Sequence, residues 1–379
     1  MASYDRALAI KPDFAEVLTN RGVALWDLKR FEDALASYDS ALAIKPDYAE
    51  ALNNRGTTLQ ELKRFEDALA SYDRALAIKS DFAEALNGRG ITLQGLKRFE
   101  EALASYDRAL AIKPDFAWAL NNRGTTLREL KRFEDALASY DSALAIKPDY
   151  AEALNGRGTI LRDLKRFDDA FASYNKALTI KPDHLHAFAG LADSALKMCD
   201  WTRTAEFDRE IVAHVVHQKS IITPFTLLGY CSDPSLQLKC ARNWLQNQIP
   251  TLPQPLWGGK IYQHERIRVA YLSAEFRQHA TAYLMAGLFE RHDRTHFEVF
   301  GVSFGVDDKS DMRSRLIKCF DQFHDVRWKT DHDVARLLNK LQVDIAIDLK
   351  GHTQDARTEI LAYRPAPIQI NYLGYPGTS

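Results

Sequence analysis

The same residues return every 34 positions through the first half of the chain. Pro12 and Pro46 stand 34 residues apart, and Ser80 takes the next place before the step resumes at Pro114. Glycine, alanine and tyrosine keep this step in register, at Gly22, Gly56, Gly90, Gly124 and Gly158, at Ala34, Ala68, Ala102, Ala136 and Ala170, and at Tyr38, Tyr72, Tyr106, Tyr140 and Tyr174. So regular a repeat constrains the fold strongly, because every unit must form one structure and pack on its neighbours.

Each unit has the pattern of two packed helices. In the unit that begins near Ala49, small Gly56 and Ala68 let the helices approach, and Tyr72 fills the space beside them. A unit of this size cannot bury its apolar face alone, and a period of 34 is the tetratricopeptide signature. We predict an α superhelix over residues 1–218, with five full repeats and partial repeats at both ends.

Asparagines recur along the first helix of the repeats. We expect this helix to line the concave face, where an amide can donate to and accept from a peptide group without reading its side chain. Solvated asparagines that bond only locally are the equally weighted alternative. The positions in question are Asn20, Asn54 and Asn122.

Composition excludes several classes of function. A formal net charge of −1 gives no drive toward nucleic acid or anionic membranes, and no apolar run is long enough to span a bilayer. The four cysteines form no C-x-x-C pair, which predicts a reduced, cytoplasmic protein without a metal site. Near-identical repeats also allow swapped homodimers.

The pattern changes after the repeats. Residues 219–262 read as a helical linker that ends in a Pro- and Gly-containing stretch. Residues 263–379 alternate strands, near 267–272, 298–304, 323–326, 343–348 and 368–372, with helices, which predicts a Rossmann-like parallel sheet. Neither G-x-G-x-x-G nor a P-loop is present, so neither a dinucleotide cofactor nor ATPase activity is expected.

Three loops follow predicted strands and would meet at one edge of this sheet. They are Ser273–Thr281, which contains Glu275 and His279, then Asp348–Thr353, and then Leu373–Ser379. A histidine in a loop is usually structural or solvated. Its place after the first strand raises the catalytic interpretation to about one in three.

Two longer stretches, with the repeats, resemble the O-linked N-acetylglucosamine transferases and their SPINDLY-like bacterial relatives. They read IRVAYLSAEFRQHATAYLM from Ile267 and DLKGHTQDARTEILAYRPAPIQINYLGYPGTS from Asp348. The resemblance implies the first Rossmann-like lobe of a GT-B enzyme. Such an enzyme uses UDP-N-acetylglucosamine as donor, with no cofactor and no metal, in an inverting transfer to Ser or Thr. It also implies roles for named residues: His279 as the active-site histidine, Thr281, Leu373 and Gly374 on the sugar and donor side, and Asn20, Asn54 and Asn122 as an acceptor-binding ladder.

The chain departs from the family pattern in several places. Gly88 and Gly156 interrupt the ladder, Arg21 and Arg55 stand where leucine is common, and Glu275 replaces the usual aspartate. Tyr283 stands where a second histidine is known. The chain also stops inside a family motif, so we expect a truncated first lobe without the second, donor-binding lobe.

These departures leave three hypotheses. The first is protein O-linked N-acetylglucosamine transfer, with acceptors held by the repeats. The second is a non-catalytic peptide-binding scaffold or inactive fragment, and the third is protein O-fucosyl transfer.

Overall fold

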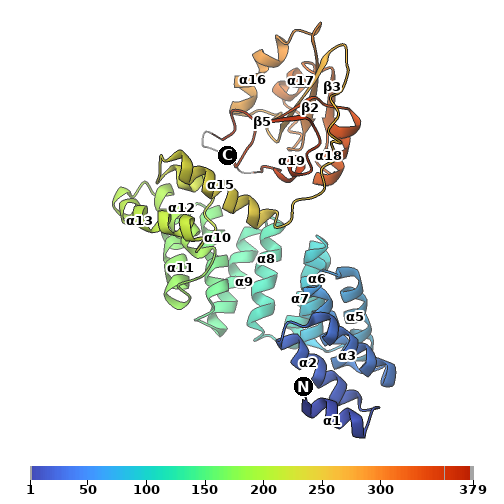
Figure 1. Ribbon diagram of the computed structural model, residues 1–379. Helices are drawn as coiled ribbons and strands as arrows, with labels where there is room; N and C mark the ends of the chain where they lie inside the picture. The colour runs from blue at the N-terminus through green and yellow to red at the C-terminus, as the bar shows by residue number, and fades with distance from the viewer. Residues whose placement is uncertain (1, 354, 376–379) are drawn as a thin grey trace. The chain divides into compact units, whose positions relative to one another are not determined.

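A computed structural model describes residues 2–353 and 355–375, and it divides into two compact units, Met1–Ser194 and Ala195–Ser379 (Figure 1). The predicted loop residues 376–379 lie outside the described part. Within the described residues, no helix is both long and apolar enough to cross a membrane.

The first unit is a stack of helix pairs that follows the 34-residue period (Figure 1). After α1 (Ala2–Ile10), the first helices of the repeats, called A helices here, are α2 (Ala15–Asp27), α4 (Ala49–Glu61), α6 (Ala83–Gly95), α8 (Ala117–Glu129) and α10 (Ala151–Asp163). The B helices are α3 (Phe31–Ile44), α5 (Phe65–Ile78), α7 (Phe99–Ile112), α9 (Phe133–Ile146) and α11 (Phe167–Ile180). Consecutive A helices approach each other more closely than consecutive B helices do, so the A helices form the concave side.

The turn between the two helices of a repeat contains a lysine in the left-handed backbone conformation, which ends the A helix. Lys63 has φ 58°, and the Arg64 N–H donates to the Leu59 carbonyl oxygen at 2.9 Å, which is the long bond of a Schellman motif. The equivalent lysines repeat this conformation in every A–B turn. The B helix α5 ends at Ile78 although Ser80 stands where the other repeats have proline, so proline is not required for this end.

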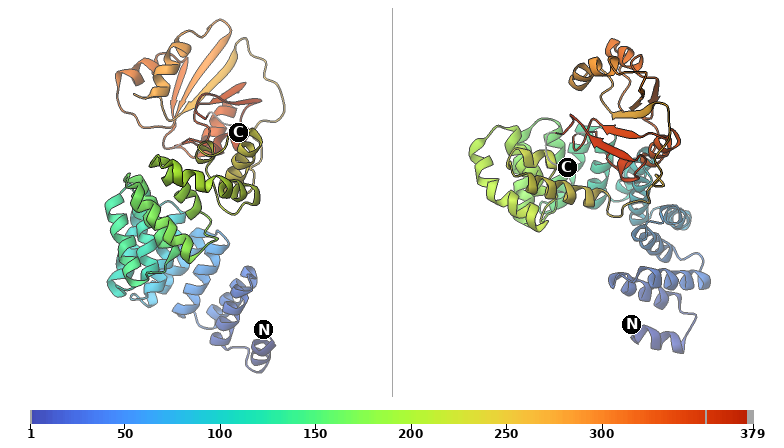
Figure 2. Two further views of the ribbon diagram at one scale, coloured as in Figure 1. Left: turned by 90° about the vertical axis from the view of Figure 1, so that its left-hand side faces the viewer. Right: turned by 45° about the horizontal axis from the view of Figure 1, so that its top comes forward.

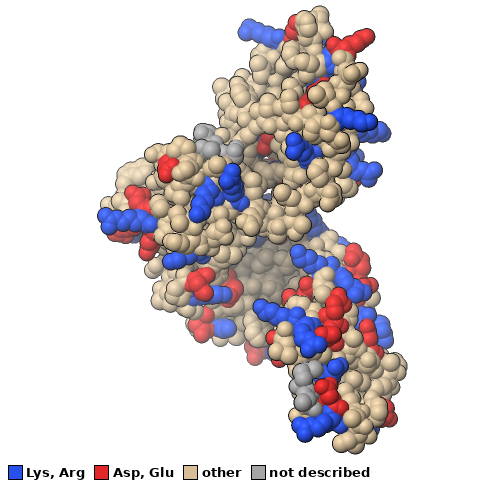
Figure 3. All heavy atoms as spheres, viewed as in Figure 1, with Lys and Arg blue, Asp and Glu red and all other residues tan. Residues whose placement is uncertain are grey.

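An arginine in each A helix joins neighbouring repeats. Arg55 Nε lies 2.7 Å from Asp39 Oδ1 of the preceding B helix, and its Nη1 donates to Ser71 Oγ at 2.6 Å. The same arrangement recurs at Arg21, Arg89, Arg123 and Arg157. These inter-repeat bonds give a structural reason for an arginine at this position of each repeat. Figure 3 shows acidic and basic side chains intermixed over the repeats on the face in view.

The partial repeat predicted at the end of the array forms α12 (Ala187–Lys197) and α13 (Trp201–His217). The second unit begins within α12. The predicted helical linker begins with the five-residue α14 (Pro224–Leu228), which is short because Pro224 begins it and Gly229 follows its last turn. The longer helix of the linker is α15 (Pro234–Gln248).

A five-stranded parallel sheet forms the centre of the second unit. Its strands are β1 (Ile267–Ser273), β2 (Phe297–Ser303), β3 (Gln322–Asp325), β4 (Ile345–Asp348) and β5 (Ile368–Asn371), in the order β3-β2-β1-β4-β5. The predicted strands are therefore confirmed. Helices α16 (Ala280–Glu290) and α17 (Asp311–Ile317) cover one face of the sheet, and α18 (Asp331–Lys340) and α19 (Glu359–Ala362) cover the other (Figure 2).

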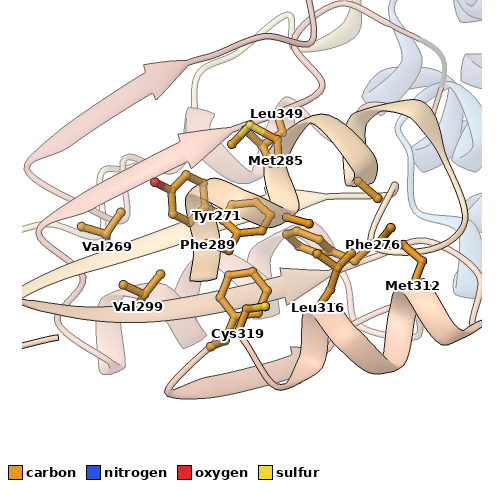
Figure 4. Close-up of a cluster of buried hydrophobic side chains, with 13 residues drawn as sticks. Val269, Tyr271, Phe276, Met285, Phe289, Val299, Met312, Leu316, Cys319 and Leu349 are labelled. Carbon is orange, nitrogen blue, oxygen red and sulfur yellow. The ribbon is translucent and has the colours of Figure 1, made fainter. Parts of the chain in front are cut away.

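Alternation along the strands builds two cores. Val269 and Tyr271 point to the α16 side and pack with Phe289, Met285 and Leu316 (Figure 4), whereas Ala270 and Leu272 belong to the core under α18. Successive residues of a strand face opposite sides of the sheet. Both sets are apolar here because helices cover both faces of a parallel sheet. This rigid sheet positions the loops described next.

Candidate functional site

The order of the strands changes direction between β1 and β4. From β1 the chain moves outward to β2 and β3, and it then returns to place β4 against the other side of β1. The loops that leave β1 and β4 therefore border the topological switch point, the place where open α/β sheets bind ligands. Glu275 and His279 lie in the first of these loops and Lys350 in the second, as the sequence predicted.

A buried ion pair joins the two loops. Lys350 Nζ donates to Glu275 Oε1 at 2.5 Å, and the two side chains are 7% and 5% exposed. Asp348 holds the second loop in shape, because its carboxylate accepts hydrogen bonds from the backbone N–H groups of Lys350 and Gly351. At the switch point, a salt bridge between residues 75 positions apart in the sequence thus joins the loop after β1 to the loop after β4.

Opposing influences act on the Glu275 carboxyl. Burial is the largest and raises its pKa, but the hydrogen bond and charge of Lys350, together with His279 and Arg277, outweigh it and leave the pKa below the ordinary glutamate value. Glu275 is therefore a carboxylate at neutral pH, and it can orient the cations and hydrogen-bond donors around it.

His279 caps the N-terminus of α16. Its Nδ1 lies 3.3 Å from the Thr281 backbone nitrogen and also 3.3 Å from Glu275 Oε2. Nδ1 accepts from Thr281 in one tautomer and donates to Glu275 in the other. No hydrogen bond in the described part of the chain involves Nε2, and the side chain is 39% exposed. Nε2 is therefore open to a ligand. Thr281, predicted in the loop, lies in the first turn of α16 because the helix already begins at Ala280.

Arg313 is a functional candidate that the sequence reasoning missed. This α17 side chain is 4% exposed, and its guanidinium donates to the Phe276 carbonyl oxygen at 2.9 Å and to Asp325 Oδ2 at 3.0 Å. It also donates to Ser303 Oγ at 3.1 Å, and Nε lies 3.0 Å from Asp307 Oδ1. One buried cation thereby ties the loops after β1 and β2 to the end of β3. Only the three-dimensional convergence of these partners singles it out among the arginines.

Leu373 and Gly374 follow β5 and lie against the loop after β4. A Cβ on Gly374 would come within 2.2 Å of the Leu349 carbonyl oxygen, so only glycine allows this approach. Leu373 has φ 68°, a left-handed conformation that is strained for leucine and that holds its half-exposed side chain in a fixed direction. Gly374 thus lies against the backbone of Leu349 and Lys350, and Lys350 is the residue whose side chain pairs with Glu275.

A cavity in this unit lies beside the site and not at His279. It has a volume of about 560 Å³ and is bordered by α15, α19 and the ends of β4 and β5. Asp348, His352 and Asn371 contribute its polar groups, and Leu245 and Leu361 are among its apolar ones. Neither His279 nor Thr281 is among its lining residues.

The three predicted ladder asparagines all lie on A helices. Asn20 is exposed, and Asn54 and Asn122 are half-buried. Asn122 Nδ2 donates to Asn87 Oδ1 of the preceding repeat at 3.1 Å, and Asn54 Oδ1 accepts from Asn53 at 3.2 Å. Two of the three amides thus already form hydrogen bonds among the A helices, as the local-bonding alternative expects, and a role in holding an acceptor stays a prediction.

Comparison with known proteins links both units to families. The tetratricopeptide repeat model matches residues 13–81, 81–149 and 115–183, and the model of glycosyl transferase family 41 matches residues 254–379. The chain joins tetratricopeptide repeats to a glycosyl transferase family 41 region. This family 41 region contains β1 to β5 and every candidate residue of the sheet edge.

Two curated proteins that are similar in sequence to this chain are both named as N-acetylglucosaminyltransferases. The chain is 29% identical over 199 residues to the probable UDP-N-acetylglucosamine–peptide N-acetylglucosaminyltransferase SEC of Arabidopsis thaliana, a match that covers 48% of this chain and 20% of that protein. It is 37% identical over 120 residues to the UDP-N-acetylglucosamine–peptide N-acetylglucosaminyltransferase of Caenorhabditis elegans, covering 31% of this chain and 10% of that protein. The chain therefore spans a fifth or less of the length of these relatives.

Among solved structures, a mutant of the Thermobaculum terrenum O-GlcNAc transferase aligns over 86% of this chain and 50% of its own, at 23% identity with a TM-score of 0.33. The type IV pilus biogenesis factor PilW aligns over 52% of this chain and 92% of its own, at 25% identity with a TM-score of 0.49.

Proposed function

We propose that this chain acts in protein O-glycosylation, transferring N-acetylglucosamine from UDP-N-acetylglucosamine to Ser or Thr of proteins held by the repeats. The observation that carries the proposal is the position of His279. It lies at the switch point of a family 41 region, with Nδ1 held by Glu275 and Thr281 and with Nε2 open. The names of the two curated relatives support the choice of sugar donor.

The geometry suits an attack by a hydroxyl. In an inverting transfer the acceptor oxygen attacks the anomeric carbon opposite the leaving group and loses its proton. With Nδ1–H donated to Glu275, Nε2 of His279 presents a lone pair to that hydroxyl. With Nδ1 accepting from Thr281, Nε2–H donates to an acceptor or sugar oxygen. Either state makes His279 the contact between the protein and the reacting groups.

The departing diphosphate needs positive charge or helix-end N–H groups. The sequence offers Arg277 and Lys350 near this edge, but Lys350 is buried in its pair with Glu275. Arg277 lies 3.3 Å from Glu275 and keeps 36% of its side chain exposed. Arg277 is thus better placed than Lys350 to meet a phosphate, and Lys350 serves to hold Glu275.

A transfer assay tests the proposal. The full chain is incubated with UDP-[³H]N-acetylglucosamine and a Ser- and Thr-containing peptide library, with chelator present. The proposal expects incorporation that falls about 100-fold or more in His279→Ala. His296→Ala is the matched control, since His296 is exposed and lies before β2, at the opposite edge of the sheet. Equal incorporation by wild type and His279→Ala would refute the role of His279. Incorporation from GDP-fucose alone would instead favour fucosyl transfer.

A non-catalytic peptide scaffold is the second candidate. The observation that favours it is the repeat array, which the tetratricopeptide model matches in register from residue 13 to residue 183. A scaffold would bind peptides on the A helices and show no incorporation from either sugar nucleotide.

A further inference from the structure

One face of the sheet in the second unit is covered only in part. Helices α16 and α17 pack over β1, β2 and β3, whereas α18 and α19 lie on the opposite face. Within residues 195–353 and 355–375, no helix shields β4 and β5 on the α16 face. Soluble proteins cover both faces of a parallel sheet, so this half of the face lacks the layer that such a sheet requires.

Four isoleucines form the uncovered half. Ile345 and Ile347 of β4 border the core under α16, and the strand register pairs them with Ile368 and Ile370 of β5. Residues paired in register point to the same face, so all four lie on the α16 side. Ile368 is 50% exposed and Ile370 is 41% exposed. A contiguous apolar surface of this kind marks a site of interaction.

Helix α16 borders this surface and is itself apolar on its outward side. Its sequence, ATAYLMAGLFE, has no charged residue before Glu290. Met285 packs in the same core as Leu349, which directly follows β4 (Figure 4), whereas Leu284 is 71% exposed and Leu288 is 45% exposed. A helix that is apolar around its circumference is normally buried on all sides. Among the described residues of this unit, nothing buries the outward side of α16.

Charge and symmetry indicate what covers both surfaces. We call the six side chains together the apolar step, which consists of Leu284, Leu288, Ile345, Ile347, Ile368 and Ile370. None of them is charged, so two copies of the step can face each other without like-charge repulsion. A two-fold axis brings the same surface of two subunits together. Each copy then supplies what the other lacks, an exposed apolar helix and an uncovered sheet face.

We propose that two copies of this chain associate about a two-fold axis, with α16 of each copy packed over β4 and β5 of the other. Leu284 and Leu288 of one copy face Ile368 and Ile370 of the other, and the partner's helix completes the layer over the sheet. The sequence also allows a homodimer built by swapping repeats, but this contact uses none of the repeats.

The contact lies close to the candidate site without depending on its chemistry. His279 caps the N-terminus of α16, and Leu284 lies roughly one helical turn beyond it. Glycosyl transfer does not enter the argument, so the dimer and the transfer can fail separately. A monomeric chain that incorporates sugar refutes this inference alone, whereas dimers without incorporation refute only the transfer.

Sedimentation velocity of the full chain, from roughly 1 to 100 μM, tests the association. We expect a concentration-dependent dimer, and we expect Leu284→Glu and Ile370→Lys each to weaken it tenfold or more. Both replaced side chains are exposed, so the variants should keep the wild-type circular dichroism. Trp328→Glu is the matched control, because Trp328 is 91% exposed and follows β3 at the far edge of the sheet. A wild-type chain that stays monomeric, or equal association in all three variants, overturns the proposal.

Mixing the two variants tests the reciprocal geometry. In a mixed dimer, the carboxylate introduced at Leu284 of one chain meets the ammonium introduced at Ile370 of the other, and the second copy of the contact keeps its wild-type pair. We expect an equal mixture of Leu284→Glu and Ile370→Lys chains to associate at least tenfold more tightly than either variant alone. A mixture that associates no better than the separate variants overturns the packing of α16 over the partner's β5. Dimers that persist in both separate variants place the contact elsewhere, as repeat swapping would, and overturn it too.

Discussion

The ring of Tyr72 occupies the space that a side chain on Gly88 would need. A Cβ at Gly88 would lie 2.5 Å from Tyr72 Cζ, although the two residues belong to different repeats. Tyr140 stands in the same relation to Gly156, and Tyr174 to Gly190. The A helices also approach more closely at the Gly88 and Gly156 interfaces than at those of Asn54 and Asn122. The interruptions of the asparagine ladder are therefore a requirement of packing.

Restoring the ladder should damage the fold. Gly88→Asn forces Tyr72 out of its place, and overpacking of this kind costs about 1–3 kcal/mol. Hydrogen exchange of α5 and α6 should become faster by the corresponding factor. Gly287→Asn is the control, because Gly287 is a helical glycine with nothing within 4 Å of its Cβ position. Unchanged exchange in Gly88→Asn would show that the ring moves aside freely.

The inter-repeat arginines should matter more than arginines paired within a turn. Arg89→Met removes a bond to Asp73 of the preceding repeat and a bond to Ser105, and we expect a loss of about 1 kcal/mol from the opening free energy of the flanking helices. Arg64→Met removes only a local, half-exposed pair with Asp67, for which less than about 0.5 kcal/mol is expected. Equal effects of the two variants, measured by hydrogen exchange, would contradict this ranking.

Arg313 should hold the sheet edge together. Arg313→Met removes the hydrogen bonds to Phe276, Ser303 and Asp325. Because about a third of the Asp325 and Asp307 side chains is exposed and Asp325 keeps Arg327, we expect a cost of about 2–3 kcal/mol. Arg315→Met, two residues away, breaks a half-exposed pair with Glu290 and should cost under about 1 kcal/mol. Thermal melting of the two variants decides the matter. If Arg315→Met lowers the melting temperature as much as Arg313→Met does, the loop-tying role is wrong.

Acid should weaken the Glu275 contacts. The folded-state pKa of Glu275 lies below its ordinary value of about 4.3, so its contribution to stability is complete above that pH and is lost as the pH falls through the folded value. Glu275→Gln lacks this contribution at every pH. The melting temperatures of wild type and Glu275→Gln should therefore differ at pH 7 and converge as the pH falls below about 4. A constant difference down to pH 3 would show that the ionised pair with Lys350 is not the cause.

Periodicity made most of the fold predictable. The 34-residue step predicted the positions of the A and B helices, and apolar runs between polar loops predicted β1 to β5. Both patterns can be read from residues close together in the sequence. The loop with His279 followed from its position after the first strand. Ser80 shows a limit of such reasoning, since α5 ends where the other B helices do although a serine stands in place of the proline.

Contacts between distant residues were not predictable in the same way. Nothing local to Glu275 indicates Lys350 as its partner, and nothing near Arg313 indicates that four groups from three loop regions meet there. The alternation of asparagine with glycine at Asn54, Gly88 and Asn122 was visible in the sequence. Its cause was not visible, because the tyrosine that requires it lies in the preceding repeat.

Calorimetric titration with UDP and UDP-N-acetylglucosamine, in chelator and without added metal, tests the central claim most directly. The account predicts saturable binding of both in the micromolar range, at one site per chain, with the affinity for UDP-N-acetylglucosamine reduced in His279→Ala. Absence of binding up to millimolar ligand would contradict a glycosyl transfer role for this chain and would leave the peptide scaffold as the account of its function.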